Sequence, residues 1–254
     1  MNGASPLGRS MARRSGVLVA TLCTTVVLVT GCSVVRPREG GPVDSGFLRD
    51  YSLLSPTERW PSLLVYRDID AGTPRYSSIR FEPVSVWREA VEGAAPISDD
   101  DLQYVADALY QALRRRFERS FTLVDTASPG TLEVNLALTS VTNAKARIEF
   151  FSTAVPAVDV QPRSGELDPA LRDFLRKVAI EGEFIDSDSG TTRAAIVDRR
   201  SPDETARGHV KTWEEVQTLF DRLAERLHER LSALRRGDFK PLLELRDAQP
   251  PSRH

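Results

Sequence analysis

The chain has 254 residues, of which 28% are charged and 41% are hydrophobic, with 34 basic against 36 acidic side chains. The resulting formal charge of −2 does not favour a nucleic-acid-binding protein, which would be expected to carry a strongly basic surface. Its two cysteines, Cys23 and Cys32, both lie near the N-terminus. The rest of the chain therefore has no thiol for a disulfide, a thiolate metal site or Cys–His catalysis.

Residues 1–31 have the pattern of a secretion signal. Arg9, Arg13 and Arg14 precede an apolar segment, residues 16–29, which ends in the small pair Thr30–Gly31. This segment of about 14 residues suits a signal core and is shorter than the ~20 residues that span a bilayer. The next residue, Cys32, can accept a diacylglyceryl group, so we predict cleavage between Gly31 and Cys32 and lipidation of Cys32.

Two alternatives to this interpretation stay open: an ordinary cleavable signal that happens to contain a cysteine, and a permanent transmembrane helix. Translation could start at Met1 or at Met11 without moving the processing point. The pattern resembles the bacterial lipobox, where signal peptidase II cuts before the lipidated cysteine. That resemblance implies an acylated (palmitate-bearing) lipoprotein, and serine rather than aspartate at position 33 favours the outer membrane, facing the periplasm. Loss of the leader would leave 31 basic and 36 acidic side chains, a formal charge of −5.

The composition divides the processed chain into three parts. Residues 32–45 are rich in Pro, Arg, Gly and Glu and predict a flexible tether, about 20 Å in average reach. Residues 46–240 predict one globular domain, and residues 241–254 a disordered tail. Partners of such a domain would be met close to the membrane.

Within the domain, residues 62–66 and 78–87 predict strands, the second of which is placed at an edge or bulge by Pro83. Ser98 predicts the N-cap of a helix that extends to Phe117, and the acidic run 99–101 fits the helix dipole better than a cation site. Further strands are expected at 121–124 and 131–141. The latter alternates apolar with polar residues, which predicts that one face is exposed.

The second half predicts a short helix from Asp168 to Lys177, a β-hairpin over residues 178–198 and a final helix from Thr212 to Gly237. The hairpin turn, residues 186–190, does not have the spacing of a calcium loop. Between residues 142 and 163 the periodicity fails. If a groove lies there, Phe150, Phe151 and Val155 are the candidate contact residues, although packing in a core or loop is the alternative.

Catalytic motifs are missing from the sequence: it contains no G-x-S-x-G elbow, no phosphate-binding glycine loop and no HExxH. The alternation of residues predicts that Glu181 and Glu183 lie on an exposed strand face, and His228 is predicted on a solvated helix face. We therefore expect no metal, no cofactor and no enzymatic activity.

Four blocks together resemble the domain-of-unknown-function 3313 family of bacterial envelope lipoproteins. They are residues 45–54; 64–66 with 81–84; 181–190 with 194–199; and Trp213 with Phe220 and Asp221. The resemblance implies an envelope location and a compact α+β domain, and it supplies no catalytic residues.

These observations predict a single α+β domain, with a mainly antiparallel sheet and two long helices packed on one of its faces. The expected function is that of a non-catalytic, lipid-anchored accessory or binding protein that contacts an envelope protein or a small ligand. A periplasmic hydrolase and a purely structural envelope component are the alternatives.

Overall fold

The computed structural model describes residues 44–68, 76–90, 93, 95–141, 148–152, 160–200 and 209–235. The chain divides into two units, residues 1–36 and residues 37–254. The first unit lies wholly outside the described residues, and all helices and strands named below belong to the second. The predicted leader, Cys32, the tail and most of the predicted tether therefore fall outside the described residues. None of the helices in the described ranges is long and apolar enough to cross a membrane.

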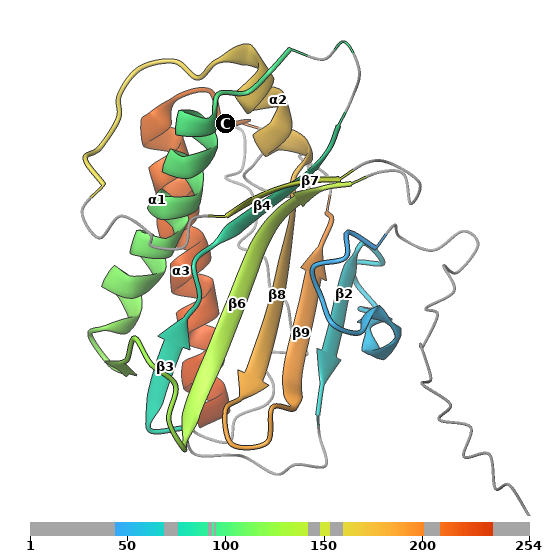
Figure 1. Cartoon of the computed structure of the whole chain (residues 1–254), viewed down its shortest axis with the longest axis vertical. Helices are drawn as coiled ribbons and strands as arrows, with labels where there is room; N and C mark the ends of the chain where they lie inside the picture. The colour runs from blue at the N-terminus through green and yellow to red at the C-terminus, as the bar shows by residue number, and fades with distance from the viewer. Residues whose placement is uncertain are drawn as a thin grey trace, which may run out of the picture. The chain divides into compact units, whose positions relative to one another are not determined.

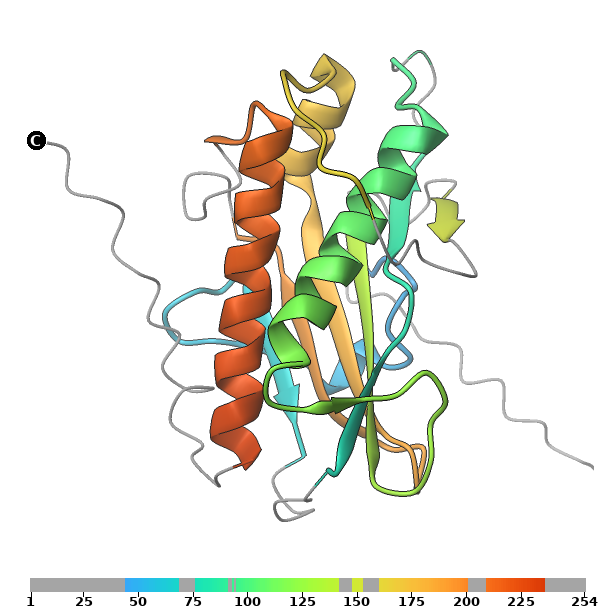
Figure 2. The same cartoon turned by 90° about the vertical axis from the view of Figure 1, so that its left-hand side faces the viewer.

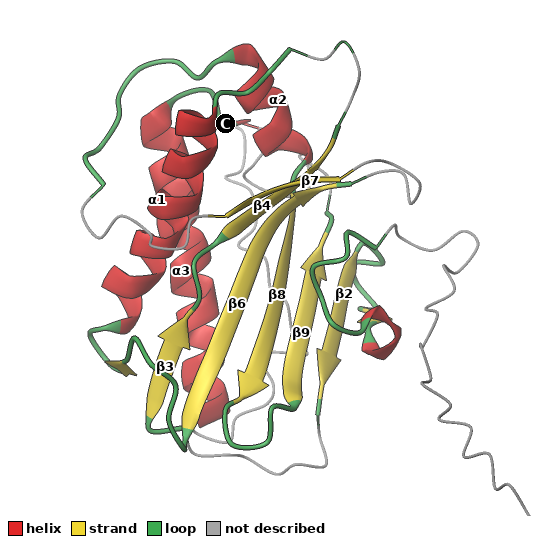
Figure 3. Ribbon diagram, in the orientation of Figure 1, coloured by secondary structure: helices red, strands yellow, loops and turns green. Residues whose placement is uncertain are grey.

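The described residues form a sheet with helices on one side (Figures 1 and 3). The elements, in chain order, are the 3-10 helix η1 (Tyr51–Leu53), β1 (Ser55–Pro56), β2 (Leu63–Arg67), β3 (Ser78–Phe81), β4 (Ser85–Glu89), α1 (Asp99–Phe117), β5 (Thr122–Leu123), β6 (Thr131–Ser140), β7 (Ile148–Ser152), α2 (Pro169–Lys177), β8 (Ala179–Asp186), β9 (Thr192–Asp198) and α3 (Trp213–Arg235). Each predicted helix and strand is present within a few residues of its expected position.

The sheet has the strand order β1-β2-β9-β8-β6-β3-β5, and β4 pairs with both β6 and β7. The predicted strand at 78–87 is divided into β3 and β4 at Glu82-Pro83-Val84. The backbone N–H of Glu82 still donates to the carbonyl of Val134 at 3.0 Å, so the chain stays beside β6 across the break. Pro83 has no N–H to continue the ladder, which explains why the interruption falls there.

The prediction of an α+β domain is confirmed, but the sheet is mixed and its mainly antiparallel character holds only in part. β6 is antiparallel to β8 yet parallel to β3 and β4, and β5 is parallel to β3. The cause is the connection through α1: a strand–helix–strand crossover returns the chain to the same end of the sheet, so the next strand runs in the same direction.

The two long helices, α1 and α3, pack against each other over one face of the sheet (Figure 2). The main hydrophobic core lies between these helices and the sheet. Local capping sets their beginnings as predicted. The Ser98 side chain accepts a hydrogen bond from the N–H of Asp101, and Thr212 and Glu215 form a reciprocal capping box.

The opposite face of the sheet differs from the prediction. Residues 131–141 were expected to leave one face of the strand exposed, yet Ala137 and Thr139 on that face are 0% and 2% exposed. They are covered because a segment near the N-terminus folds across this side of the sheet.

Candidate functional site

The covering segment is residues 44–54, here called the N-terminal strap, which crosses the sheet face opposite α1 and α3 (Figure 1). Gly46 has a φ of 90°, a left-handed conformation that a residue with a side chain adopts only under strain. Leu48 and Leu54 pack on Ala195 and Val197 of β9 to form a small second core. The strap is thus an integral part of the fold.

A buried carboxylate, Glu181 of β8, ties the strap to the sheet. Its side chain is 0% exposed. One oxygen accepts from Ser45 Oγ at 3.0 Å and from Tyr51 OH at 2.5 Å, both in the strap. The other accepts from Thr139 Oγ1 at 2.8 Å and from Arg199 Nη2 at 3.4 Å. Four donors therefore surround one carboxylate, as a buried charge requires.

The electrostatics of this cluster follow from burial and from the charge on Glu181. Burial, reinforced by the neighbouring Glu181 carboxylate, raises the pKa of Tyr51, so its hydroxyl stays protonated and donating. Burial also raises the pKa of Asp44; Arg199 opposes that rise and Glu181 adds to it. The cluster therefore stabilises the hydrogen bond from the protonated Tyr51 hydroxyl to the Glu181 carboxylate.

Glu183, two residues along β8, makes a second attachment. Its Oε1 accepts from Arg49 Nε at 3.0 Å and from Thr192 Oγ1 at 2.7 Å, while Arg49 also donates to the carbonyl of Gly190 at 3.0 Å. Glu183 is 3% exposed, so the prediction that Glu181 and Glu183 lie on an exposed face is wrong. Their partners in the strap are 130 to 136 positions away in the chain. Local alternation carries no information about such distant contacts.

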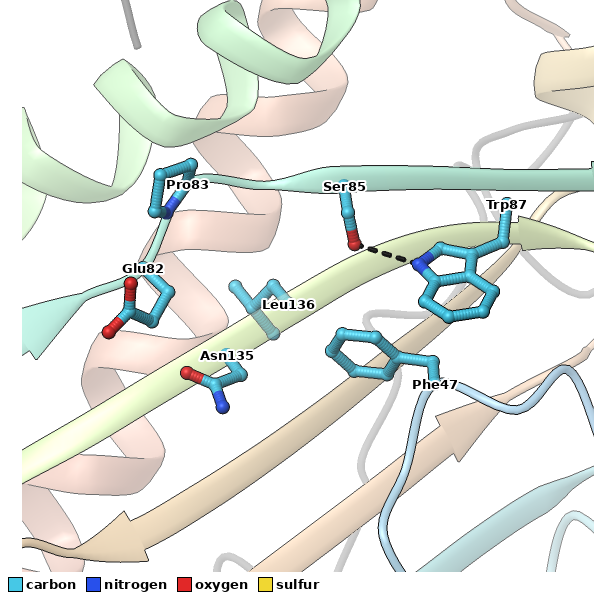
Figure 4. A pocket seen from close by; sticks show the side chains of 7 residues that line it. All are labelled: Phe47, Glu82, Pro83, Ser85, Trp87, Asn135 and Leu136. Atoms are coloured by element: carbon cyan, nitrogen blue, oxygen red, sulfur yellow. Dashed lines mark hydrogen bonds between the residues drawn. The ribbon is translucent and has the colours of Figure 1, made fainter. Parts of the chain in front are cut away.

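Beside these attachments, the strap and the interrupted β3–β4 segment border an open pocket of about 330 Å³ (Figure 4). Phe47 of the strap and Trp87 of β4 form one wall, with ring centroids 6.2 Å apart and planes at 73°. Trp87 Nε1 donates to Ser85 Oγ at 3.0 Å, which holds the indole in place. The described residues that line it are Phe47, Glu82, Pro83, Ser85, Trp87, Asn135 and Leu136.

Of the predicted contact residues, Phe151 is the one whose side chain the structure describes, and it does not line this pocket. Phe151 of β7 is half-buried and packs against the main core, which is the alternative named above for it. The backbone of Phe150 lies opposite Trp87 in the β4–β7 register, while its side chain and the whole of Val155 lie outside the described residues. Sequence reasoning missed the pocket, although its lining includes residues from two of the family-like blocks, 45–54 and 81–84.

His228 differs from its prediction as well. It is 8% exposed, between the rings of Phe117 and Phe121, and its Nε2 lies 2.5 Å from Ser120 Oγ. Burial, reinforced by the nearby Arg116 charge, lowers the pKa of His228. It is a packing residue between α1 and α3 rather than a solvated one.

The hairpin turn uses Asp186 as a local hydrogen-bond acceptor. Its Oδ1 accepts from the N–H groups of Asp188 and Ser189, and its Oδ2 from Tyr76 and Arg193. Burial alone would raise the pKa of Asp186, but these bonds outweigh it and lower the pKa to about 2.

Within the described ranges, no three His, Cys, Asp or Glu side chains are grouped so that they could hold a metal ion.

The chain was also compared with models of known protein families. The chain matches the family described as "Protein of unknown function (DUF3313)" over residues 43–227. The chain belongs to this family. The match begins at the strap, and two of the blocks that resemble the family, residues 45–54 and 181–190, are the ones that contact each other through Glu181 and Glu183.

Similarity to solved structures is distant. Two crystal structures of the PelC dodecamer from Paraburkholderia phytofirmans, one of them a point variant, have 11% and 9% sequence identity and TM-scores of 0.29 and 0.27. Each alignment covers 68% of this chain, and 95% and 96% of the PelC chain. A search of curated proteins finds no match to this chain.

Proposed function

We propose that this family member is a non-catalytic binding protein of the bacterial envelope, anchored by lipid on Cys32 in the outer membrane and facing the periplasm. One observation carries the proposal. The carboxylates available for acid–base chemistry on the sheet face, Glu181 and Glu183, are occupied by donors from the strap and the sheet, whereas a pocket with an aromatic wall lies beside them. Such a pocket suits binding of a small ligand or of a side chain from an envelope protein.

The hydrolase alternative has less support. A general acid or base must come within hydrogen-bond reach of the substrate, and Glu181 is fully buried with its oxygens engaged. Glu82 is the single titratable side chain among the described residues that line the pocket. An acid–base pair in the pocket would need a second such group, which the lining does not supply.

The position of the strap fits the anchoring hypothesis. The strap begins a dozen residues after Cys32, so a tether of that length would keep the domain within roughly 20 Å of the lipid surface. The hydrogen bonds from the strap to Glu181 and Glu183 would then connect the tether to β8, an inner strand of the sheet. A ligand or partner would be met at the membrane surface.

The test of anchoring is membrane fractionation of cells that express the wild type, Cys32→Ala or the matched control Cys23→Ala. We expect the wild type and Cys23→Ala in the outer-membrane fraction and Cys32→Ala released or unprocessed. Equal fractionation of all three proteins would contradict the proposal. Crosslinking of the wild-type membrane fraction followed by mass spectrometry would then identify a protein partner.

The test of the non-catalytic role is turnover of ester, peptide and glycoside substrates by the full chain. We expect none above the level of a Glu82→Gln variant. Turnover that disappears in Glu82→Gln would show that the pocket is an active site and would revive the hydrolase alternative.

A further inference from the structure

We propose that the pocket selects a ligand that carries a primary ammonium group on a small ring or apolar body. This inference rests on the proposed binding function and names the class of ligand. It is drawn from three properties of the lining: its charge, its hydrogen-bond acceptors and its aromatic wall.

The charge of the pocket favours a cation. Among the residues that the structure describes, its lining contains one carboxylate, Glu82, and no lysine, arginine or histidine. Arg80 is next to this carboxylate, with Nη1 2.5 Å from Glu82 Oε1, but the same nitrogen also lies 3.0 Å from Glu133 Oε2. One guanidinium is thus shared by two carboxylates, which leaves a net negative charge at this end of the pocket.

The hydrogen-bonding groups of the pocket favour a donor. Asn135 Oδ1 is buried without a hydrogen-bond partner among the described residues. Asn135 follows Val134, whose carbonyl accepts from the Glu82 backbone, so Glu82 and Asn135 are neighbours across β3 and β6. A buried acceptor without a donor is unfavourable. If the Asn135 amide turned toward the pocket, this oxygen and the Glu82 carboxylate could both accept from one ligand ammonium, which would remove that deficit.

The aromatic wall favours the same chemistry. The indole N–H of Trp87 is already used by Ser85, so the wall offers ring surface to a ligand. In Figure 4, Phe47 and Trp87 lie together at one side of the lining, with Leu136 between them and Glu82. Ring faces attract cations and pack on flat apolar groups, and a volume of about 330 Å³ is large enough for a single-ring molecule.

The test is calorimetric titration of the full chain, purified in detergent micelles, with two probes of matched size. Benzylamine is protonated at pH 7 and carries the ammonium group, while benzyl alcohol replaces that group with a neutral hydroxyl. The variants are Glu82→Gln, which removes the pocket carboxylate, and Asn135→Leu, which removes the unpartnered oxygen. Glu149→Gln is the control, because Glu149 pairs with Arg88 and neither residue is among the described residues that line the pocket.

We expect the wild type and Glu149→Gln to bind benzylamine about five- to tenfold more tightly than benzyl alcohol. Glu82→Gln and Asn135→Leu should each reduce that preference to about twofold or less. Equal affinity for the two probes, no binding of either at millimolar concentration, or an unchanged preference in Glu82→Gln would overturn the inference. Because the anchoring proposal is judged by fractionation of the Cys32 variant, failure of either proposal is recognised independently of the other.

Discussion

Replacement of Glu181 by alanine is the most informative test of the strap. The substitution removes the acceptor of Ser45, Tyr51 and Thr139, together with the buried carboxylate that Arg199 pairs with. The Arg199 side chain is 18% exposed and Glu181 is 0% exposed, so water replaces the lost partner poorly. Removing one partner of a buried ion pair costs about 3–5 kcal/mol. We expect Glu181→Ala to lower the free energy of unfolding by that amount.

The measurement is urea unfolding of the wild type and variants, followed by circular dichroism. Glu149→Ala is the matched control, because it removes the same side chain from a half-exposed pair with Arg88 and should cost at most about 1 kcal/mol. Hydrogen exchange of the Phe47 and Leu48 amides, which both donate to Tyr51 OH, reports on the strap itself. If Glu181→Ala costs no more than Glu149→Ala and leaves that exchange unchanged, Glu181 does not hold the strap.

Three further predictions concern packing, capping and pH. Leu48→Ala, in the small core beneath the strap, should lower the free energy of unfolding by about 2 kcal/mol, measured by the same denaturation; a loss below about 0.5 kcal/mol would mean that the strap is not packed in solution. Ser98→Ala should cost about 1 kcal/mol through loss of the α1 N-cap, whereas an unchanged urea midpoint would argue against the cap. Because the pKa of His228 is lower in the folded chain than its ordinary value of 6.5, the unfolded chain binds the proton first, and the free energy of unfolding should fall as the pH drops below about 6.5. In thermal unfolding, the stability of His228→Gln should fall less than that of the wild type between pH 7.5 and 5.5. An equal fall in both proteins would show that another group causes the pH dependence.

Much of this fold could be predicted from sequence because its signals are local. The caps at Ser98, Asp168 and Thr212 join groups two or three residues apart, and the hairpin turn at Asp186 joins groups within four residues. Helical and strand periodicity likewise depend on neighbouring residues alone. These signals predicted the helices, most strands and the α+β class, and the family-like blocks predicted the family.

Only the tertiary structure decided how those elements face one another. The alternation around Glu181 correctly predicts a strand but says nothing about what covers it. Its partners in the covering strap, Ser45 and Tyr51, lie 136 and 130 residues earlier in the chain. The parallel pairing of β6 with β3 depends on the path taken by α1, and the burial of His228 depends on the packing of α3 against the end of α1. The pocket forms where the strap lies beside the interruption between β3 and β4, so no local pattern could indicate it. Sequence by itself determined the elements and the family, whereas long-range packing determined which polar groups are buried and where a ligand can bind.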